Sequence, residues 1–119
     1  MTGTETDVMV TTDVPCTSIS AAIVSLSGMQ TYMPACTNGD FGIAVYHPDS
    51  TQTDVVVVAT VDGSDPATCL TTPGTGCIVA RRNAPVAYQT NVNVVLEQAC
   101  AGMSCPANQT CMNGFCAGF

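Results

Sequence analysis

Residues 55–61 read Val-Val-Val-Val-Ala-Thr-Val, and this run decides the fold class. Valine and threonine are branched at Cβ, which favours extended backbone over helix. The run is apolar at odd and even positions alike, so both faces of the strand are expected to be buried. It therefore predicts a central β-strand, and it is far too short to cross a membrane as a helix.

Runs of related composition lie on both sides of this stretch. In 91–97, the residues Val92, Val94 and Leu96 alternate with polar ones, which is the period-two pattern of a half-buried strand. Turn sequences such as Asn38-Gly39-Asp40 separate the runs. Together they predict an all-β, immunoglobulin-like or transthyretin-like two-sheet sandwich, with further strands in 8–14, 19–26, 41–46 and 77–81.

The N-terminal run, residues 6–14, is expected at an edge of the sandwich. Its apolar residues alternate, it contains no lysine, and Pro15 follows only at its exit, so it lacks the features that usually protect an edge strand. Such a segment either completes its own sheet, which we favour, or adds to the sheet of a neighbouring copy. Head-to-tail addition of that kind would build filaments.

The length of 119 residues fits one domain, and the net charge of −7 restricts its partners. Nine acidic residues face two arginines and no lysine. Binding to nucleic acid requires clustered positive charge, so that class is excluded, and the same requirement argues against docking on anionic lipid. A hydrophobic fraction of 46% also excludes a disordered chain.

Eight cysteines indicate disulfides formed in an oxidising compartment. The only histidine, His47, is far from the cysteines in sequence, so their spacing fits a zinc site poorly. Sequence does not fix the pairing. Pairing between cysteines that are close in sequence favours Cys16–Cys36 and Cys69–Cys77. In the last cluster it favours two overlapping bridges, Cys100–Cys111 and Cys105–Cys116.

The composition changes at Cys100, after which aliphatic residues almost disappear. We therefore predict a β-sandwich domain over residues 6–99 and a small cystine-rich knuckle, without a core of its own, over residues 100–119.

Residues 100–116 read Cys-Ala-Gly-Met-Ser-Cys-Pro-Ala-Asn-Gln-Thr-Cys-Met-Asn-Gly-Phe-Cys and resemble the cystine knuckle of predicted secreted proteins and lipoproteins of myxobacteria and related bacteria. Asp13-Val-Pro-Cys16 and Gly76-Cys-Ile-Val-Ala-Arg-Arg82 resemble the β-rich domain that often precedes that knuckle. The resemblance implies a secreted or cell-surface location and no assigned activity. Residues 1–5 do not resemble a signal peptide or a lipobox, so we expect the export signal to be absent from this sequence.

Candidate ligand-binding residues are few. Asp62-Gly-Ser-Asp65 offers two carboxylates and a hydroxyl for calcium, although the same residues are typical of a turn. Arg81, Arg82 and Tyr88 are candidate interaction residues, although pairing with nearby carboxylates is the favoured interpretation of the two arginines.

The sequence carries no nucleophile motif and no lysine base, so we expect no enzymatic activity and no required cofactor. The favoured function is an extracellular structural or interaction module that contacts other protein subunits or assembles with itself into a fibre or envelope. The alternative is a carbohydrate-binding module of a cell-surface protein, with specificity carried by loops and tyrosines.

Overall fold

The computed structural model describes residues 5–26, 29–47, 52–71, 74, 76–85, 89–106 and 109–118. This part of the chain is all-β, as predicted, with strands β1 to β9 arranged in three sheets. Three short 3-10 turns connect them, namely η1 (Cys16–Ser18), η2 (Pro66–Leu70) and η3 (Gln98–Cys100). None of the described helical turns is long and apolar enough to cross a membrane.

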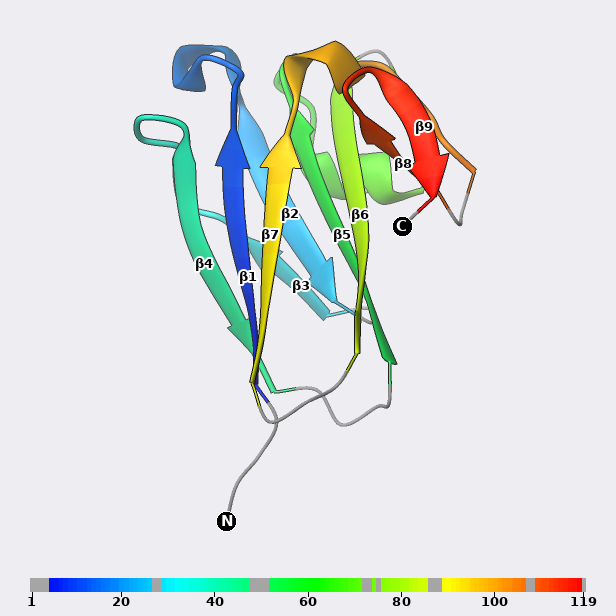
Figure 1. The fold of residues 1–119 in the computed structure, drawn as a ribbon. Helices are drawn as coiled ribbons and strands as arrows, with labels where there is room; N and C mark the ends of the chain where they lie inside the picture. The colour runs from blue at the N-terminus through cyan, green and yellow to red at the C-terminus, as the bar shows by residue number, and fades with distance from the viewer. Residues whose placement is uncertain are drawn as a thin grey trace.

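Two sheets pack face to face in a sandwich-like arrangement (Figure 1). The three-stranded sheet has the order β4-β1-β7, with β1 (Glu5–Thr12) antiparallel to β4 (Asp40–Tyr46) and parallel to β7 (Gln89–Leu96). The four-stranded sheet is antiparallel throughout and has the order β3-β2-β5-β6. Its strands are β3 (Met29–Tyr32), β2 (Ala21–Leu26), β5 (Gln52–Thr60) and β6 (Cys77–Pro85).

The N-terminal strand β1 is not an edge strand, which corrects the expectation for residues 6–14. It pairs with β4 along one side and with β7 along the other, so its main chain is bonded within its own sheet on both sides. Its residues Val8 and Val10 are completely buried between the sheets. Donating this strand to a neighbour would remove the centre of a sheet.

Strand β5 occupies the central position that its composition predicts. Val55 and Val57 face the interior of the sandwich, while Val58 faces the opposite side of the sheet. All three are fully buried. Burial on both faces requires two separate apolar clusters, and the structure contains both.

The larger cluster fills the space between the two sheets and includes Val8, Val24, Val57, Ile78 and Leu96. The smaller cluster lies on the outer face of the four-stranded sheet and consists of Ile23, Val58, Cys69, Cys77 and Val79. Turn η2 contributes Cys69 to this second cluster, with Ala67 and Leu70 packed against it. We refer to this outer face as the covered face.

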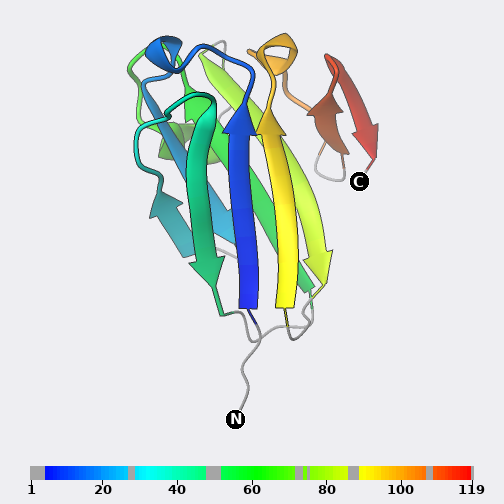
Figure 2. The same cartoon turned by 60° about the vertical axis from the view of Figure 1, so that its left-hand side comes forward.

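Strands β8 (Gln109–Met112) and β9 (Phe115–Gly118) form a hairpin that packs beside β6 (Figure 2). The Arg81 backbone N–H donates to Thr110 Oγ1 at 2.8 Å, and this bond takes up a main-chain group on the side of β6 away from β5. Cys100 and Cys111 belong to the larger apolar cluster. The knuckle is thus packed against the sandwich along the β6 edge.

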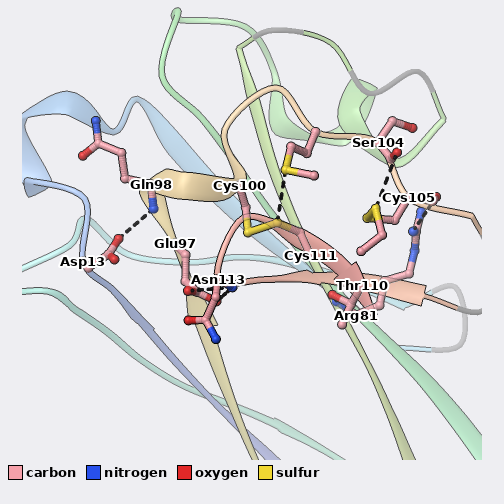
Figure 3. The surroundings of a disulfide bond; sticks show 12 residues. Asp13, Arg81, Glu97, Gln98, Cys100, Ser104, Cys105, Thr110, Cys111 and Asn113 are labelled. Carbon is pink, nitrogen blue, oxygen red and sulfur yellow. Dashed lines mark hydrogen bonds between the residues drawn. A yellow bond between two sulfur atoms is a disulfide. The ribbon is translucent and has the colours of Figure 1, made fainter. Parts of the chain in front are cut away.

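Four disulfides connect all eight cysteines, in the pairs that locality favours: Cys16–Cys36, Cys69–Cys77, Cys100–Cys111 and Cys105–Cys116. Figure 3 shows the surroundings of the Cys100–Cys111 bond, where Glu97 accepts from the Asn113 backbone N–H. Asp13 accepts from the Gln98 backbone N–H at 2.7 Å and ties the end of β1 to η3.

Candidate functional site

The outer face of the three-stranded sheet differs from the covered face, and we call it the bare face. Strand register places Met9 of β1 beside Ile43 of β4 and beside Asn93 of β7. The next row towards the β1 N-terminus consists of Val45, Asp7 and Asn91. In Figure 2 the three strands of this sheet lie in front of the rest of the sandwich.

Large apolar side chains are exposed on the bare face. Ile43 is 54% exposed and Val45 is 53% exposed, while Met9 and Val95 are each about two-fifths exposed. Ile43, Val45 and Met9 form a continuous strip along the β4 side, whereas Asn91 and Asn93 make the β7 side polar. Contiguous exposed apolar side chains of this kind mark interaction sites on soluble proteins.

The strip borders an edge of the sheet. Among the described residues, β4 pairs with β1 on one side, and no strand pairs with its other side. The sequence of β4 contains neither lysine nor proline, the residues that commonly block strand addition. Its one irregularity is a bulge near Gly42, where φ is +97° and where the register with β1 shifts. Beyond this bulge the strand is regular from Ile43 to Tyr46.

Two acidic residues occupy the N-terminal end of the bare face. Glu5 and Asp7 point to the same side of β1 because side chains alternate along a strand. A hydrogen bond with Asp7, reinforced by charge repulsion between the two carboxyl groups, raises the pKa of Glu5 above its ordinary value. Asp7 is half-buried, and its Oδ1 atom is buried without a hydrogen-bond partner.

The two candidate calcium ligands, Asp62 and Asp65, accept hydrogen bonds that stabilise turns. Asp62 Oδ1 accepts from the Ser64 backbone N–H at 3.0 Å, which lowers the pKa of Asp62. Asp65 Oδ1 caps η2 by accepting from the Ala67 backbone N–H at 3.0 Å, and it also accepts from the Tyr32 hydroxyl at 2.8 Å. Both bonds lower the pKa of Asp65.

Within the described ranges, no three His, Cys, Asp or Glu side chains cluster closely enough to hold a metal ion. The calcium site at Asp62 and Asp65 stays a prediction. What the structure does establish for Asp65 is a structural role, since its carboxylate joins η2 to β3 and so helps to hold the cover of the covered face in place.

Two of the candidate interaction residues, Arg81 and Arg82, lie on β6 and not on the bare face. Arg81 Nη1 donates to the backbone oxygens of Cys105 and Gln109, so its side chain holds the knuckle. Arg82 is half-buried and donates to the Arg81 backbone oxygen at 2.7 Å, and burial lowers its pKa. Tyr88 lies outside the described residues.

The two other tyrosines do not gather at one surface. Tyr46 is buried, and its hydroxyl contacts Thr31 Oγ1 at 2.7 Å and the Val24 backbone oxygen at 3.2 Å. Tyr32 is more than half exposed and donates to Asp65. The first joins the two sheets and the second holds η2, so each has a structural partner.

A pocket of about 410 Å³ opens at the end of the sandwich where η1 and η3 lie. Buried Val14 and Ile78 belong to its lining, together with the polar side chains of Ser18, Ser20 and Gln98. None of its lining residues is charged. The volume falls within the usual range for small-molecule sites.

Sequence reasoning did not single out the bare face or this pocket. The signal for the bare face was present, because residues 41–46 are apolar at odd and even positions, as residues 55–61 are. The pocket had no local signal, since its lining comes from four separate segments of the chain.

Comparisons with protein-family models, with curated proteins and with solved structures gave no match for this chain. The candidate sites therefore rest on geometry and chemistry alone.

Proposed function

We propose that this protein is a non-enzymatic extracellular interaction module that docks a protein partner on the bare face and along the free side of β4. The observation that carries the proposal is the exposed strip of Met9, Ile43 and Val45 beside that edge. An added strand gains affinity from main-chain hydrogen bonds and specificity from alternate side chains. The free side of β4 offers main-chain groups to such a strand, and the exposed strip offers contacts to its side chains.

The contrast with the covered face supports the proposal. There the chain uses η2 to bury Val58 and Val79, which would otherwise be exposed on the outside of the sheet. Burying an aliphatic side chain contributes about 1.5–3 kcal/mol. The bare face offers similar side chains to a partner.

Location and family are parts of the same proposal. Four disulfides fit an oxidising environment, which is typical of secreted and cell-surface proteins. The resemblance to secreted proteins and lipoproteins of myxobacteria points to the same location and stays a prediction.

For the finer fold type we propose the transthyretin-like alternative. In an immunoglobulin constant-type sandwich the first, second, fourth and fifth strands form the four-stranded sheet. Here that sheet contains the second, third, fifth and sixth strands. This order supports the transthyretin-like arrangement by elimination of the other.

Two kinds of partner are to be distinguished at such a surface, namely a second copy of the chain, as in a fibre or envelope subunit, and a different protein. Selection of peptides from a random displayed library on the whole protein tests the docking surface itself. We expect the selected peptides to lose binding to Ile43→Asp and to keep binding to Phe115→Asp. Phe115 is the matched control because it is 74% exposed but lies on the knuckle. The reverse pattern would place the interaction surface on the knuckle and contradict the proposal.

A second candidate function is carbohydrate binding, and the end pocket is the observation that favours it. An apolar floor with hydroxyl and amide groups at the rim suits an uncharged, hydroxylated ligand. Titration with N-acetylglucosamine, followed by amide NMR shifts, should perturb residues around η1 in the wild type and not in Thr17→Phe, which fills the pocket. Thr71→Phe, directly after η2, is the control. Equal shifts in all three proteins, or none, would exclude this function.

A further inference from the structure

The bare face carries negative charge at its N-terminal end, where electrostatic attraction to His47, the residue after β4, only partly offsets the rise in the pKa of Glu5. Asp7 lies in the row next to Met9, with Val45 on one side and Asn91 on the other. Its Oδ1 has no hydrogen-bond partner, and a buried carboxylate oxygen in that state is unfavourable unless a donor is supplied. Glu5 adds a second carboxyl group at the same end of the face. Positive charge on a partner would therefore favour its binding at this end of the face.

Apart from His47, which interacts with Glu5, the chain has little positive charge to offer to this face. It contains no lysine, and its two arginines are adjacent residues of β6. Arg81 Nη1 is bonded to knuckle carbonyls, and Arg82 is half-buried and bonded to the Arg81 carbonyl. Both belong to the four-stranded sheet, whereas Asp7 belongs to the other sheet.

A second copy of the chain is a poor occupant for the same reason. It brings another net charge of −7. If the two copies paired through their β4 edges, each would place its own Asp7 near the shared interface and neither would provide a lysine or a free arginine. Like charges brought close together oppose association, whereas complementary charges favour it.

Strand geometry indicates how a basic partner would reach Asp7. Val45 is directly opposite Asp7 and lies between it and the free side of β4. Neighbouring strands are about 4.8 Å apart, so a strand added beside β4 lies about 10 Å from β1. A lysine or arginine at the position opposite Val45 would lay its aliphatic stem over Val45 and bring its charged end to Asp7. Alternate residues of the added strand would point towards the sandwich interior and should be apolar.

Resting on the proposed docking function, we propose that the partner is a different protein that adds an extended segment of alternating apolar and basic residues to β4, with a lysine or arginine over Val45 and against Asp7.

The test uses the whole isotope-labelled protein and synthetic peptides of about eight residues, the length of an ordinary strand. The probe alternates lysine with valine, and the matched peptide alternates glutamate with valine. At low salt we expect the lysine peptide to shift the amide signals of β4 and to bind at least about tenfold more tightly than the glutamate peptide. Light scattering of the protein alone should give the mass of one chain.

Three substitutions locate the effect. Asp7→Asn should weaken the lysine peptide about tenfold, because it removes the charge and keeps the shape. Asp54→Asn removes the same charge from an exposed position on β5 and should change binding by less than about twofold. Val45→Lys places an ammonium group next to Asp7 within the chain and should also weaken the lysine peptide.

The possible failures are separable. Equal binding of both peptides at β4, or self-association that Ile43→Lys abolishes, would overturn the basic partner and leave the docking function standing. A single-chain mass with no peptide binding at β4 would contradict both. Equal losses in Asp7→Asn and Asp54→Asn would show only a general effect of net charge and would overturn the role of Asp7.

Discussion

The two outer faces of the sandwich present aliphatic side chains but differ in what covers them. On the covered face Ile23, Val58 and Val79 are buried beneath η2, which comes from the connection between β5 and β6. On the bare face Ile43 and Val45 are more than half exposed. The difference does not lie in the strands, because β4 and β5 are both apolar on two faces.

The comparison shows that burial on the outside of a sheet depends on a segment from elsewhere in the chain. Turn η2 is held by the Cys69–Cys77 disulfide and by the bond between Tyr32 and Asp65. The disulfide and the hydrogen bond hold η2 over the smaller apolar cluster. Substitutions beneath or within η2 should therefore lower the free energy of unfolding more than equivalent substitutions on the bare face.

The largest difference is expected from two isoleucine substitutions. Ile23→Ala creates a cavity under η2, where Ile23 is fully buried, and should lower the free energy of unfolding by about 3 kcal/mol. Ile43→Ala removes an exposed side chain and should change it by less than about 0.5 kcal/mol. Urea unfolding measures both. Equal losses would mean that the bare face is also covered in solution, and would contradict the contrast between the faces.

The second largest effect is expected from removal of the Cys69–Cys77 disulfide, which holds η2. Replacing Cys69 and Cys77 by alanine should lower the free energy of unfolding by about 2.5 kcal/mol in the chain-entropy account. It should also loosen η2 and increase the binding of a hydrophobic dye to the folded protein. The matched control replaces Cys105 and Cys116, whose bridge closes a loop of similar length in the knuckle.

This control variant should lose similar stability without the increase in dye binding at low denaturant. If both variants bind the dye equally, the Cys69–Cys77 bridge does not hold the cover of the second cluster.

The smallest effect is a pH-dependent one. Hydrogen bonds from the Ala67 backbone N–H and from Tyr32 lower the pKa of Asp65 in the folded protein. Their stabilising contribution is therefore present above the unfolded pKa and is lost as the pH falls through the lower folded pKa. Tyr32→Phe should move the folded pKa of Asp65 towards its ordinary value, which NMR titration of the carboxyl carbon measures.

The stability difference between wild type and Tyr32→Phe should be present at neutral pH and disappear in strong acid. An unchanged pKa of Asp65 would show that the Tyr32 bond does not persist in solution, and η2 would then rest on its disulfide alone.

Much of the fold was predictable from short-range sequence patterns. The runs at 55–61 and 91–97 correspond to β5 and β7, because period-two alternation and β-branched residues act within a single strand. Strand β3 was not predicted, since its four residues are all exposed and carry no apolar pattern. The hairpin of β8 and β9 was not predicted either, because its stability comes from disulfides and from contacts with β6.

The candidate site was much less predictable. Asp62, Asp65, Arg81 and Arg82 attracted attention as polar residues in turns or in a chain with few charged residues, yet the structure gives them hydrogen bonds that hold loops and the knuckle. The exposed strip is made of ordinary aliphatic residues. Nothing in a single strand tells whether such residues will be buried.

The sequence by itself determined that this protein is all-β and that its cysteines are suited to local pairing, because alternation, branching at Cβ and turn residues act over a few positions. Only the tertiary structure decided which apolar faces are buried. Residues 41–46 and 55–61 are alike in having apolar side chains on both faces, but β5 lies between β2 and β6 under η2, whereas β4 lies at an edge. Burial is a property of neighbours in space, and those neighbours come from distant parts of the chain.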